Sequence, residues 1–499
     1  MELANRSQNG AEGKDLLARR IFTPPHSWRR IGFASGAADS KAARTYPHTS
    51  MKNRRQFLRT AAAATAVPFI LPSRVWSADV SPNSRITMGF IGMGKQNGGL
   101  LGGFMGQPGV QVVAVCDVDK NRRESAQKRV EEKYSKTKPD GWKGCEAYND
   151  FRELTSRKDI DAVCIATPDH WHAIPTIAAL ANGKDVYCEK PLTHNIHEAV
   201  AVIAAVKQYE RVLQTGSMQR SSGEFRVAAE LVRNGVIGKI SRVDCQFNGP
   251  PRPNDLPEEA AEPGLDWDRW LGPAAVKPYS SVLSPRGLHD NFPLWREYAE
   301  YGGGYVCDWG AHHLDIAQWG LGRDGGGPVE IRPPANSAEM IAQKKNLDVQ
   351  GCEHVYEDGV IARHVKEGYG VHFFGETGEV KVNRGQFEII QGGKVTYSKA
   401  VQGGTDRAYM MAERDLLKDA KVKLYKSTNH LADFLTCVRS RQKPITNEIV
   451  GGGTAIACHL INIAYKLAKP FKWDPAQNAF KEGGDVKLLT REYRGEWKV

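Results

Sequence analysis

The sequence predicts an α/β protein of two domains, in which a doubly wound parallel sheet precedes an α/β domain built on a mostly antiparallel, open sheet. Apolar strands alternate with helical segments from residue 85 to about residue 234, as a parallel sheet requires. Beyond Ile240 the strands become longer and helices rarer, as in an antiparallel sheet with one free face. A length of 499 residues also exceeds what one hydrophobic core accommodates. We therefore expect a first domain over residues 79–220 and a second over residues 221–499.

The net charge of +11 is concentrated in the leader, residues 1–78. That segment holds 13 of the 68 Lys and Arg and 4 of the 57 Asp and Glu, which leaves the remaining chain at +2. A nearly neutral body has no general electrostatic footprint for a phosphate backbone. The charge distribution therefore argues against a nucleic-acid-binding protein.

Within the leader, a pair of arginines precedes an apolar run. Arg54-Arg55 lies in a basic region followed by Phe-Leu, and residues 60–71 are small and apolar. The run is far shorter than the roughly 20 apolar residues of a spanning helix, so we expect no stable membrane span. The pattern is typical of a twin-arginine signal over residues 51–78, which predicts export of the folded protein to the periplasm by the twin-arginine machinery. Such signals start shortly before the arginines, so we expect Met51 to be the true start and residues 1–50 to be a non-native or disordered extension.

The first strand of the body, Arg85–Ile91, runs straight into a glycine-rich turn. Gly92 and Gly94 stand where a dinucleotide-binding turn must be tight and must bring its amides close to a pyrophosphate. The third glycine of that pattern is displaced, and Asn97 holds its place. The sequence therefore predicts a Rossmann domain with Gly92, Gly94 and Asn97 in its cofactor site.

The second strand, Val110–Cys116, ends in Asp117. An acid here can accept hydrogen bonds from the adenosine ribose and repels a 2′-phosphate. NAD is therefore the expected cofactor. Arg122 and Arg123 follow closely and offer a clamp for a phosphate, which keeps NADP as the alternative.

Two later strands end in polar residues that belong to the same edge of the sheet. Asp161–Ala166 is followed by Thr167 and Pro168, and Asp185–Cys188 is followed by Glu189 and Lys190. Ligands of a doubly wound sheet bind beyond the carboxyl ends of its strands. We therefore expect Thr167, Pro168, Glu189 and Lys190 to lie beside the cofactor.

The second domain is predicted from alternating strands, an insertion and two closing helices. The expected strands are 240–247, 354–365, 369–374 and 379–382, and the expected closing helices are 430–440 and 451–469. A Pro/Gly-rich insertion covers residues 249–304, with a short helix at 266–271, and residues 402–428 form a polar, variable segment.

A glycine run at 302–304 opens a helix that carries Asp308 and His312. Residues four apart share one helical face, so Asp308 can orient the His312 imidazole and raise its basicity. His313 points about 100° away and is expected to be structural.

The ordered set of a glycine turn, an acid after the second strand, Thr-Pro, Glu-Lys-Pro and then Asp-x-Gly-x-His resembles the Gfo/Idh/MocA oxidoreductase family over residues 84–470. The resemblance implies a Rossmann domain followed by an α/β domain whose open sheet often mediates homo-oligomers, here a dimer or tetramer. It also implies that Lys190, Asp308 and His312 match the catalytic triad of the family's sugar and cyclitol dehydrogenases.

The reaction implied by the resemblance is hydride transfer between a nicotinamide and the CHOH group of a sugar or cyclitol. His312 would take the hydroxyl proton, and Lys190 would stabilise the charge that develops on the same oxygen. Because free NAD is scarce outside the cytoplasm, we expect the cofactor to be tightly held. Position alone suggests four substrate contacts: Arg220, His289, Arg296 and Tyr305.

Three alternatives remain open at this stage. The first is an NAD-dependent glycoside hydrolase acting by transient oxidation and elimination, a branch that the resemblance implies would lack Lys190. The second is a non-catalytic sugar- or nucleotide-binding protein. The third is a metal site using Asp308, His312 and His289, although we expect that no metal is bound. The nine cysteines form no CxxC pair and are expected to be buried thiols.

Overall fold

The computed structural model describes residues 85–136 and 142–499. The twin-arginine signal and the predicted extension over residues 1–50 lie outside these ranges. In the described part, no helix combines the length and the apolar character that crossing a membrane requires.

Six parallel strands form the first sheet, in the order β3-β2-β1-β4-β5-β6. Along the chain they are β1 (Ile86–Ile91), β2 (Val110–Cys116), β3 (Glu146–Tyr148), β4 (Ala162–Ile165), β5 (Asp185–Cys188) and β6 (Leu213–Thr215). The helices between them are α2 (Lys95–Met105), α3 (Lys120–Ser135), α4 (Phe151–Ser156), α5 (Ala173–Ala181) and α6 (Ile196–Tyr209). The strand order reverses between β1 and β4, which is where a doubly wound sheet binds its ligand. The predicted fold of the first domain is confirmed.

The apolar core of this sheet also receives a helix from late in the sequence. Phe104 of α2 and Tyr187 of β5 meet edge to face, with ring centroids 5.5 Å apart. Phe434 of α14 (His430–Ser440) lies 5.9 Å from Tyr187 in the same cluster. The chain therefore returns to the first sheet after eight of the ten strands of the second sheet and before the last two, and the predicted division at residue 220 stays a prediction.

Ten strands form the second sheet, in the order β14-β13-β12-β11-β7-β10-β9-β8-β15-β16. They are β7 (Ile240–Gln246), β8 (Glu330–Arg332), β9 (Glu353–Val355), β10 (Ile361–Val365), β11 (Val371–Gly375), β12 (Gly378–Asn383), β13 (Gln386–Gln391), β14 (Lys394–Ser398), β15 (Phe471–Asp474) and β16 (Ala479–Glu482). Neighbouring strands are antiparallel except β7 and β10. The predicted mostly antiparallel sheet is confirmed.

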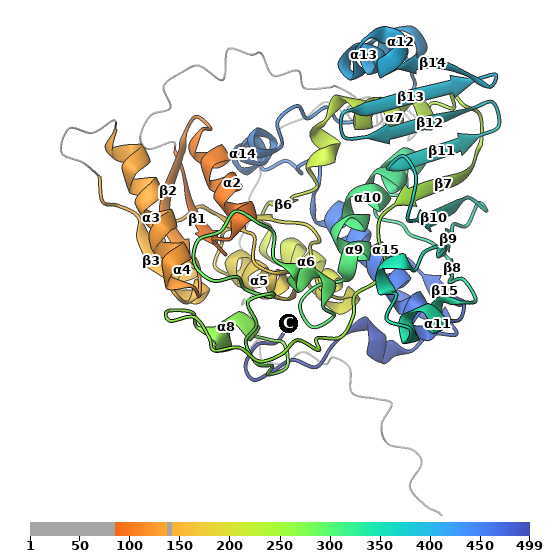
Figure 1. Cartoon of the computed structure of the whole chain (residues 1–499). Helices are drawn as coiled ribbons and strands as arrows, with labels where there is room; N and C mark the ends of the chain where they lie inside the picture. Colours follow the sequence, from red (N-terminus) through yellow and green to blue (C-terminus); the bar gives the residue numbers. More distant parts are fainter. Residues whose placement is uncertain (1–84, 137–141) are drawn as a thin grey trace, which may run out of the picture. The chain divides into compact units, whose positions relative to one another are not determined.

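One face of the second sheet carries helices. These are α7 (Gly223–Arg233), α10 (Gly310–Leu321) and α15 (Glu448–Leu467) (Figure 1). Burial alternates along β7 and β10, so the side chains between the helix-facing ones are partly exposed. The second sheet is therefore open on its other face.

Two expectations for this domain are wrong in detail, and the polar segment 402–428 holds a helix that was not predicted. The single strand predicted at 354–365 is split into β9 and β10 by a turn at 356–359, where Gly359 has a positive φ of 84°. The segment 402–428 contains the amphipathic helix α13 (Thr405–Leu416). The two predicted helices do not close the chain, because β15 and β16 follow α15.

The insertion predicted at 249–304 contains little regular structure beyond α8 (Trp267–Leu271) and a 3-10 turn at Leu294–Glu297, and it leads into α9 (Gly304–Asp308). It is held by an aromatic cluster in which Trp270 lies 4.5 Å from Trp267 and 5.0 Å from Tyr301. This cluster gives the insertion a core of its own.

Candidate functional site

A cavity of about 790 Å³ lies beyond the carboxyl ends of β1, β2, β4 and β5. Its walls combine the glycine turn, the strand ends, the insertion and the junction of α9 with α10. The volume is in the usual range of cofactor and ligand sites, and the walls come from both sheets' domains.

The glycine turn leaves room that a side chain would fill. Gly92 has a φ of 80°, and a Cβ there would lie 2.8 Å from the backbone nitrogen of Thr167. A Cβ on Gly94 would meet no atom within 4 Å, and Gly94 offers no side-chain cap to the amides at the start of α2. Thr167 Oγ1 is buried in the same wall without a hydrogen-bond partner. Free amides at a helix N-terminus, an open cradle and an unpaired hydroxyl fit the pyrophosphate of a dinucleotide.

Asn97 does not line the cavity, which corrects its predicted role as a cofactor contact. Its side chain is fully buried and donates to the Ile91 carbonyl at 3.0 Å, while the Cys164 thiol donates to its oxygen at 3.3 Å. The third position of the glycine pattern therefore faces the sheet. Asn97 supports the glycine turn through its hydrogen bond to the Ile91 carbonyl.

Asp117 lies at the end of β2 and lines the cavity. Its carboxylate accepts from the Met93 amide at 2.5 Å and from the Asp119 amide at 2.8 Å. Arg122 also lines this wall, held 3.2 Å from Asp119 and 2.7 Å from the Pro285 carbonyl. An acid and a guanidinium therefore stand together where the ribose of a dinucleotide is expected, which fits either NAD or NADP.

Lys190 and Asp308, 118 residues apart, form an ion pair in the cavity wall. Lys190 Nζ also donates to the Asp308 carbonyl at 3.1 Å. Behind them the Glu189 carboxylate accepts from Gln96 Nε2 at 2.8 Å and from the Lys190 amide at 3.1 Å. Burial raises the pKa of Glu189 although Lys190 opposes the shift. The first domain thus contributes Lys190 and the second domain contributes Asp308 to one ion pair in the cavity wall.

Asp308 is held as a carboxylate. Burial raises the pKa of its carboxyl, but Lys190 and Arg296 outweigh burial and leave the pKa below its usual value. Arg296 Nε lies 3.6 Å from Asp308 Oδ1.

Pro168, which the sequence predicts as a cofactor contact, also lines the cavity.

His312 lines the cavity, but the predicted pairing of its ring with Asp308 is not found among the described contacts. Helix α9 ends at Asp308 and α10 starts at Gly310, so Trp309 interrupts the helix between the two side chains. His312 Nδ1 is buried without a hydrogen-bond partner. Burial, with Lys190 next in importance, lowers the pKa of His312 well below its usual value, so the ring is neutral and able to take a proton.

Arg220 is a structural residue, which corrects its predicted role as a substrate contact. Its side chain is 1% exposed and is bound by Asp315 and Asp324 at 2.8 and 2.7 Å. It also stacks on Trp319 at 5.0 Å. A buried guanidinium needs carboxylate partners to offset its lost hydration. Arg220 is paired with two carboxylates, and its side chain does not line the cavity.

The other three predicted substrate contacts line the cavity at different places. Tyr305 donates to Glu297 at 3.4 Å, and Arg296 lies beside Asp308. His289 instead contacts Arg122, with Nε2 3.3 Å from the guanidinium, so it belongs to the ribose wall.

Sequence reasoning missed two side chains in the wall. Asp169 follows the predicted Thr-Pro turn directly, and burial raises the pKa of its carboxyl to about 8. Arg384 comes from the turn between β12 and β13, where no motif marked it. In the described ranges, no three His, Cys, Asp or Glu side chains cluster as metal ligands, and the nine cysteines are buried and unpaired.

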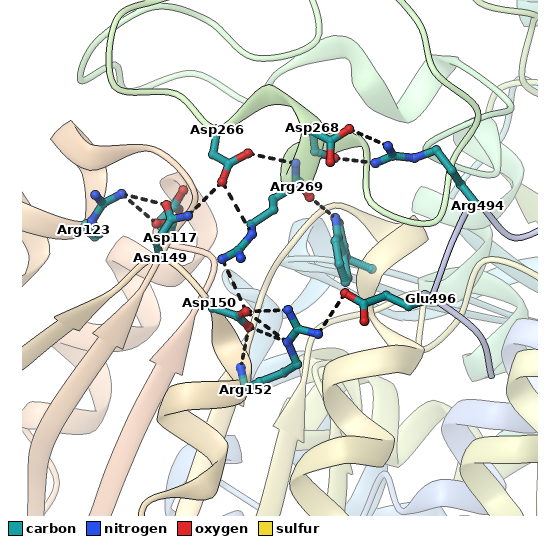
Figure 2. A network of polar contacts seen from close by, with 11 residues as sticks. Asp117, Arg123, Asn149, Asp150, Arg152, Asp266, Asp268, Arg269, Arg494 and Glu496 are labelled. Atoms are coloured by element: carbon teal, nitrogen blue, oxygen red, sulfur yellow. Dashed lines mark hydrogen bonds and ion pairs between the residues drawn. The ribbon is translucent and has the colours of Figure 1, made fainter.

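The part of the cavity wall that follows β3, at Asn149 and Asp150, is covered by two segments that are distant in sequence. Figure 2 shows Asp150 joined to Arg152 and Arg269, with the tail residue Glu496 joined to Arg152. The tail residue Arg494 is joined to Asp268 of the insertion. Arg269 belongs to the insertion and lies 3.3 Å from Asp150. We call this part the clamp end, and the part around Lys190, Asp308 and His312 the lysine end.

The tail contributes both charge and bulk to the clamp end. Arg494 binds Asp268 of the insertion at 2.5 Å and donates to the Gly272 carbonyl at 2.9 Å. Trp497 lines the cavity and packs 4.9 Å from Trp171. Trp497 therefore adds to the wall that the insertion begins, and Arg494 ties the tail to the insertion.

Two family models match the chain. Residues 86–217 match the Gfo/Idh/MocA model described as an oxidoreductase family with an NAD-binding Rossmann fold, and residues 236–370 match the C-terminal α/β domain of that family.

Curated relatives match part of the chain at low sequence identity. A glycosyl hydrolase family 109 protein of Shewanella baltica is 27% identical over 214 residues, which cover 39% of this chain and 46% of the relative. A 2,7-anhydro-N-acetylneuraminate hydratase of Mediterraneibacter gnavus is 28% identical over 125 residues, 25% of this chain and 31% of the relative. The chain thus spans about half or less of the length of these relatives.

Among solved structures, an aldose-aldose oxidoreductase of Caulobacter crescentus superimposes with a TM-score of 0.51 at 17% identity, covering 78% of this chain and 99% of that one. At this identity the likeness concerns the fold. Together, the two matched domains and the observed architecture show that the chain belongs to the Gfo/Idh/MocA oxidoreductase family.

Proposed function

We propose that this protein transfers hydride between a nicotinamide cofactor and a secondary alcohol of a sugar, glycoside or cyclitol. The observation that carries the proposal is the Lys190–Asp308 ion pair, which shares one cavity with the glycine turn and with a neutral His312. A cation, a base and a dinucleotide cradle in one cavity are the parts that alcohol oxidation requires.

The cofactor, when bound, supplies the hydride acceptor or donor. Gly92, Gly94, Asp117, Thr167 and Pro168 are the residues that would hold it.

At the lysine end, Lys190 donates a hydrogen bond to the substrate oxygen and stabilises its developing negative charge. His312 takes the proton of the same hydroxyl in the oxidative direction. Asp308 holds Lys190 in position through the ion pair, a role that differs from the predicted orientation of His312.

We further propose that the cofactor is NAD, held tightly and recycled within the site. Support comes from Asp117 at the ribose position and from the insertion and tail that roof the clamp end. The proposed export to the periplasm by the twin-arginine machinery agrees with a retained cofactor, because that route carries folded proteins and a cofactor can travel inside. The open face of the second sheet supports a homo-oligomer, a dimer or tetramer, as the working assembly.

The decisive experiment purifies the protein without added nucleotide and measures the bound cofactor by mass spectrometry. Sugars and inositols are then added while the near-ultraviolet band of bound NADH is recorded. We expect co-purified nucleotide and a spectral change with at least one sugar. A nucleotide-free protein that releases NADH into solution on turnover would contradict the retained cofactor, and no spectral change with any polyol would contradict the oxidoreductase.

A second candidate is an NAD-dependent glycoside hydrolase that oxidises its substrate transiently and releases the aglycone by elimination. It is favoured by the sequence match to proteins named glycosyl hydrolase family 109. Aryl glycosides distinguish the two: release of the phenol with no net change in bound cofactor supports the hydrolase, and a net redox change without release supports the dehydrogenase.

A further inference from the structure

One cation of the cavity differs from the others in its partners. Six Lys and Arg side chains line the cavity: Lys95, Arg122, Lys190, Arg269, Arg296 and Arg384. The first five lie within 4.0 Å of a carboxylate, on Asp290, Asp119, Asp308, Asp150 and Asp308 respectively. Within residues 85–136 and 142–499, no carboxylate lies within that distance of Arg384. Its charge is therefore not neutralised by a direct partner in the wall.

The position of Arg384 is fixed by a short turn. Arg384 and Gly385 connect β12 to β13, whose last paired residues are Asn383 and Gln386. Gly385 has a φ of 65°, and its carbonyl accepts from Thr405 Oγ1 at 2.7 Å. The turn thus carries Arg384 from the second sheet to the lysine end on an anchored backbone.

The guanidinium itself is oriented without being neutralised. It stacks over the indole of Trp309 at 4.8 Å. With the Gln219 amide oriented to donate to the His312 carbonyl at 3.1 Å, the Gln219 oxygen accepts from Arg384 Nε at 3.2 Å. Trp309 and Gln219 therefore fix the plane and the inner edge of the guanidinium, and the two terminal nitrogens keep no hydrogen-bond partner in the described structure.

A planar guanidinium with its two terminal nitrogens available matches the two oxygens of a carboxylate. A phosphate fits less well, because a dianion would meet two carboxylates, Asp308 and Glu189, that already interact with the Arg384 charge. We propose that Arg384, held by Trp309 and Gln219, binds the carboxylate of an acidic sugar, so that the substrates are sugar acids. This inference rests on the proposed function, whose substrate class it narrows.

The test compares matched pairs that differ only by the carboxylate: glucuronate with glucose, and galacturonate with galactose, with glucose 6-phosphate as the phosphate arm. The holoenzyme is assayed as wild type, Arg384→Gln and Arg384→Lys. The control is Arg332→Gln, since Arg332 pairs with Glu330 on the second sheet and does not line the cavity.

We expect wild type to prefer the acid of at least one pair. Arg384→Gln should lower kcat/KM for that acid by about 10- to 100-fold more than for its neutral partner, as the loss of a charged hydrogen-bonded pair predicts. Arg384→Lys should retain part of the preference, and Arg332→Gln should retain all of it. Equal losses for acid and neutral sugar in Arg384→Gln, or a preference for the phosphate ester, would overturn the inference.

Binding separates this inference from the proposed function. Quenching of tryptophan fluorescence by glucuronate and by glucose is titrated on the same holoenzymes, with nucleotide content and melting temperature as checks of folding. Acid-specific quenching that is lost in Arg384→Gln, in a protein that oxidises no sugar, would refute the oxidoreductase and retain the carboxylate site. Turnover of neutral sugars without any preference for acids would retain the oxidoreductase and refute the carboxylate site.

Discussion

The two ends of the cavity use charge in opposite ways. At the lysine end, one ion pair joins the two domains, His312 Nδ1 has no partner, and Arg384 has no carboxylate beside it in the described structure. At the clamp end, arginines and carboxylates from three segments are tied to one another. Polar groups without partners are costly, so they persist where a ligand can use them. Under the proposed function, the lysine end would carry the chemistry and the clamp end would retain the cofactor.

The largest expected effect is at His312. His312→Ala should lower kcat by about 10² to 10⁴-fold, the usual contribution of a positioned general base, while the bound nucleotide remains. Stopped-flow reduction of the bound cofactor measures the loss. Because the pKa of His312 is lowered, the wild-type rate should persist below the pH at which an ordinary histidine is protonated. A rate that falls already at about pH 6.5, or a variant that loses its nucleotide, would break the division between the two ends.

The second largest effect is expected at Lys190. Lys190→Ala is expected to reduce turnover by about 10² to 10³-fold, the range seen when one donor to a developing oxyanion is removed, with little change in nucleotide content. Lys184→Ala is a matched control, since that buried lysine donates to the Arg157 and Ile160 carbonyls and does not line the cavity. Retained turnover in Lys190→Ala would refute its role at the substrate oxygen.

The clamp end should show the converse pattern. Arg494→Ala removes the contacts with Asp268 and the Gly272 carbonyl and should speed nucleotide release by about tenfold, with chemistry unchanged in the first turnover. Release is followed by dilution into a scavenging dehydrogenase, and Arg332→Ala serves as the exposed ion-pair control. If release is unchanged while the first turnover slows, the tail acts on the lysine end instead.

The smallest effect concerns stability and pH. Burial gives Asp169 a pKa of about 8 in the folded protein against an ordinary 3.8, so the folded state keeps a proton that the unfolded chain loses. The stability of wild type should therefore fall as pH rises through this interval, and Asp169→Asn should fall less between about pH 5 and about pH 8. Urea unfolding of both proteins at the two values tests this. Parallel losses would mean that Asp169 is already ionised.

The sequence was sufficient for features that depend on local pattern. Strand ends carry Asp117, Thr167 and Lys190 to one edge because a parallel sheet has a single carboxyl side, and this needs no knowledge of the rest. Features that depend on long-range packing were missed. The burial of Arg220 depends on Asp315 and Asp324, about a hundred residues away, which no spacing reveals.

Three further misses have the same origin. Asn97 occupies a motif position that faces either the ligand or the sheet, and only the packing of Cys164 against it decides which. Arg384 reaches the cavity because the second sheet is ordered so that β12 and β13 end beside α10, a property of topology and not of the residues around it. The break between α9 and α10 likewise separated Asp308 from His312 against the helical spacing.

The tail makes one wall of the cavity depend on residues that belong to neither sheet. Trp497 packs on Trp171, and Arg494 binds Asp268 of the insertion. Removal of the tail by a protease should therefore open the clamp end while both sheets keep their strands. Limited proteolysis is thus expected to separate the proposed retention of the cofactor from the chemistry at the lysine end.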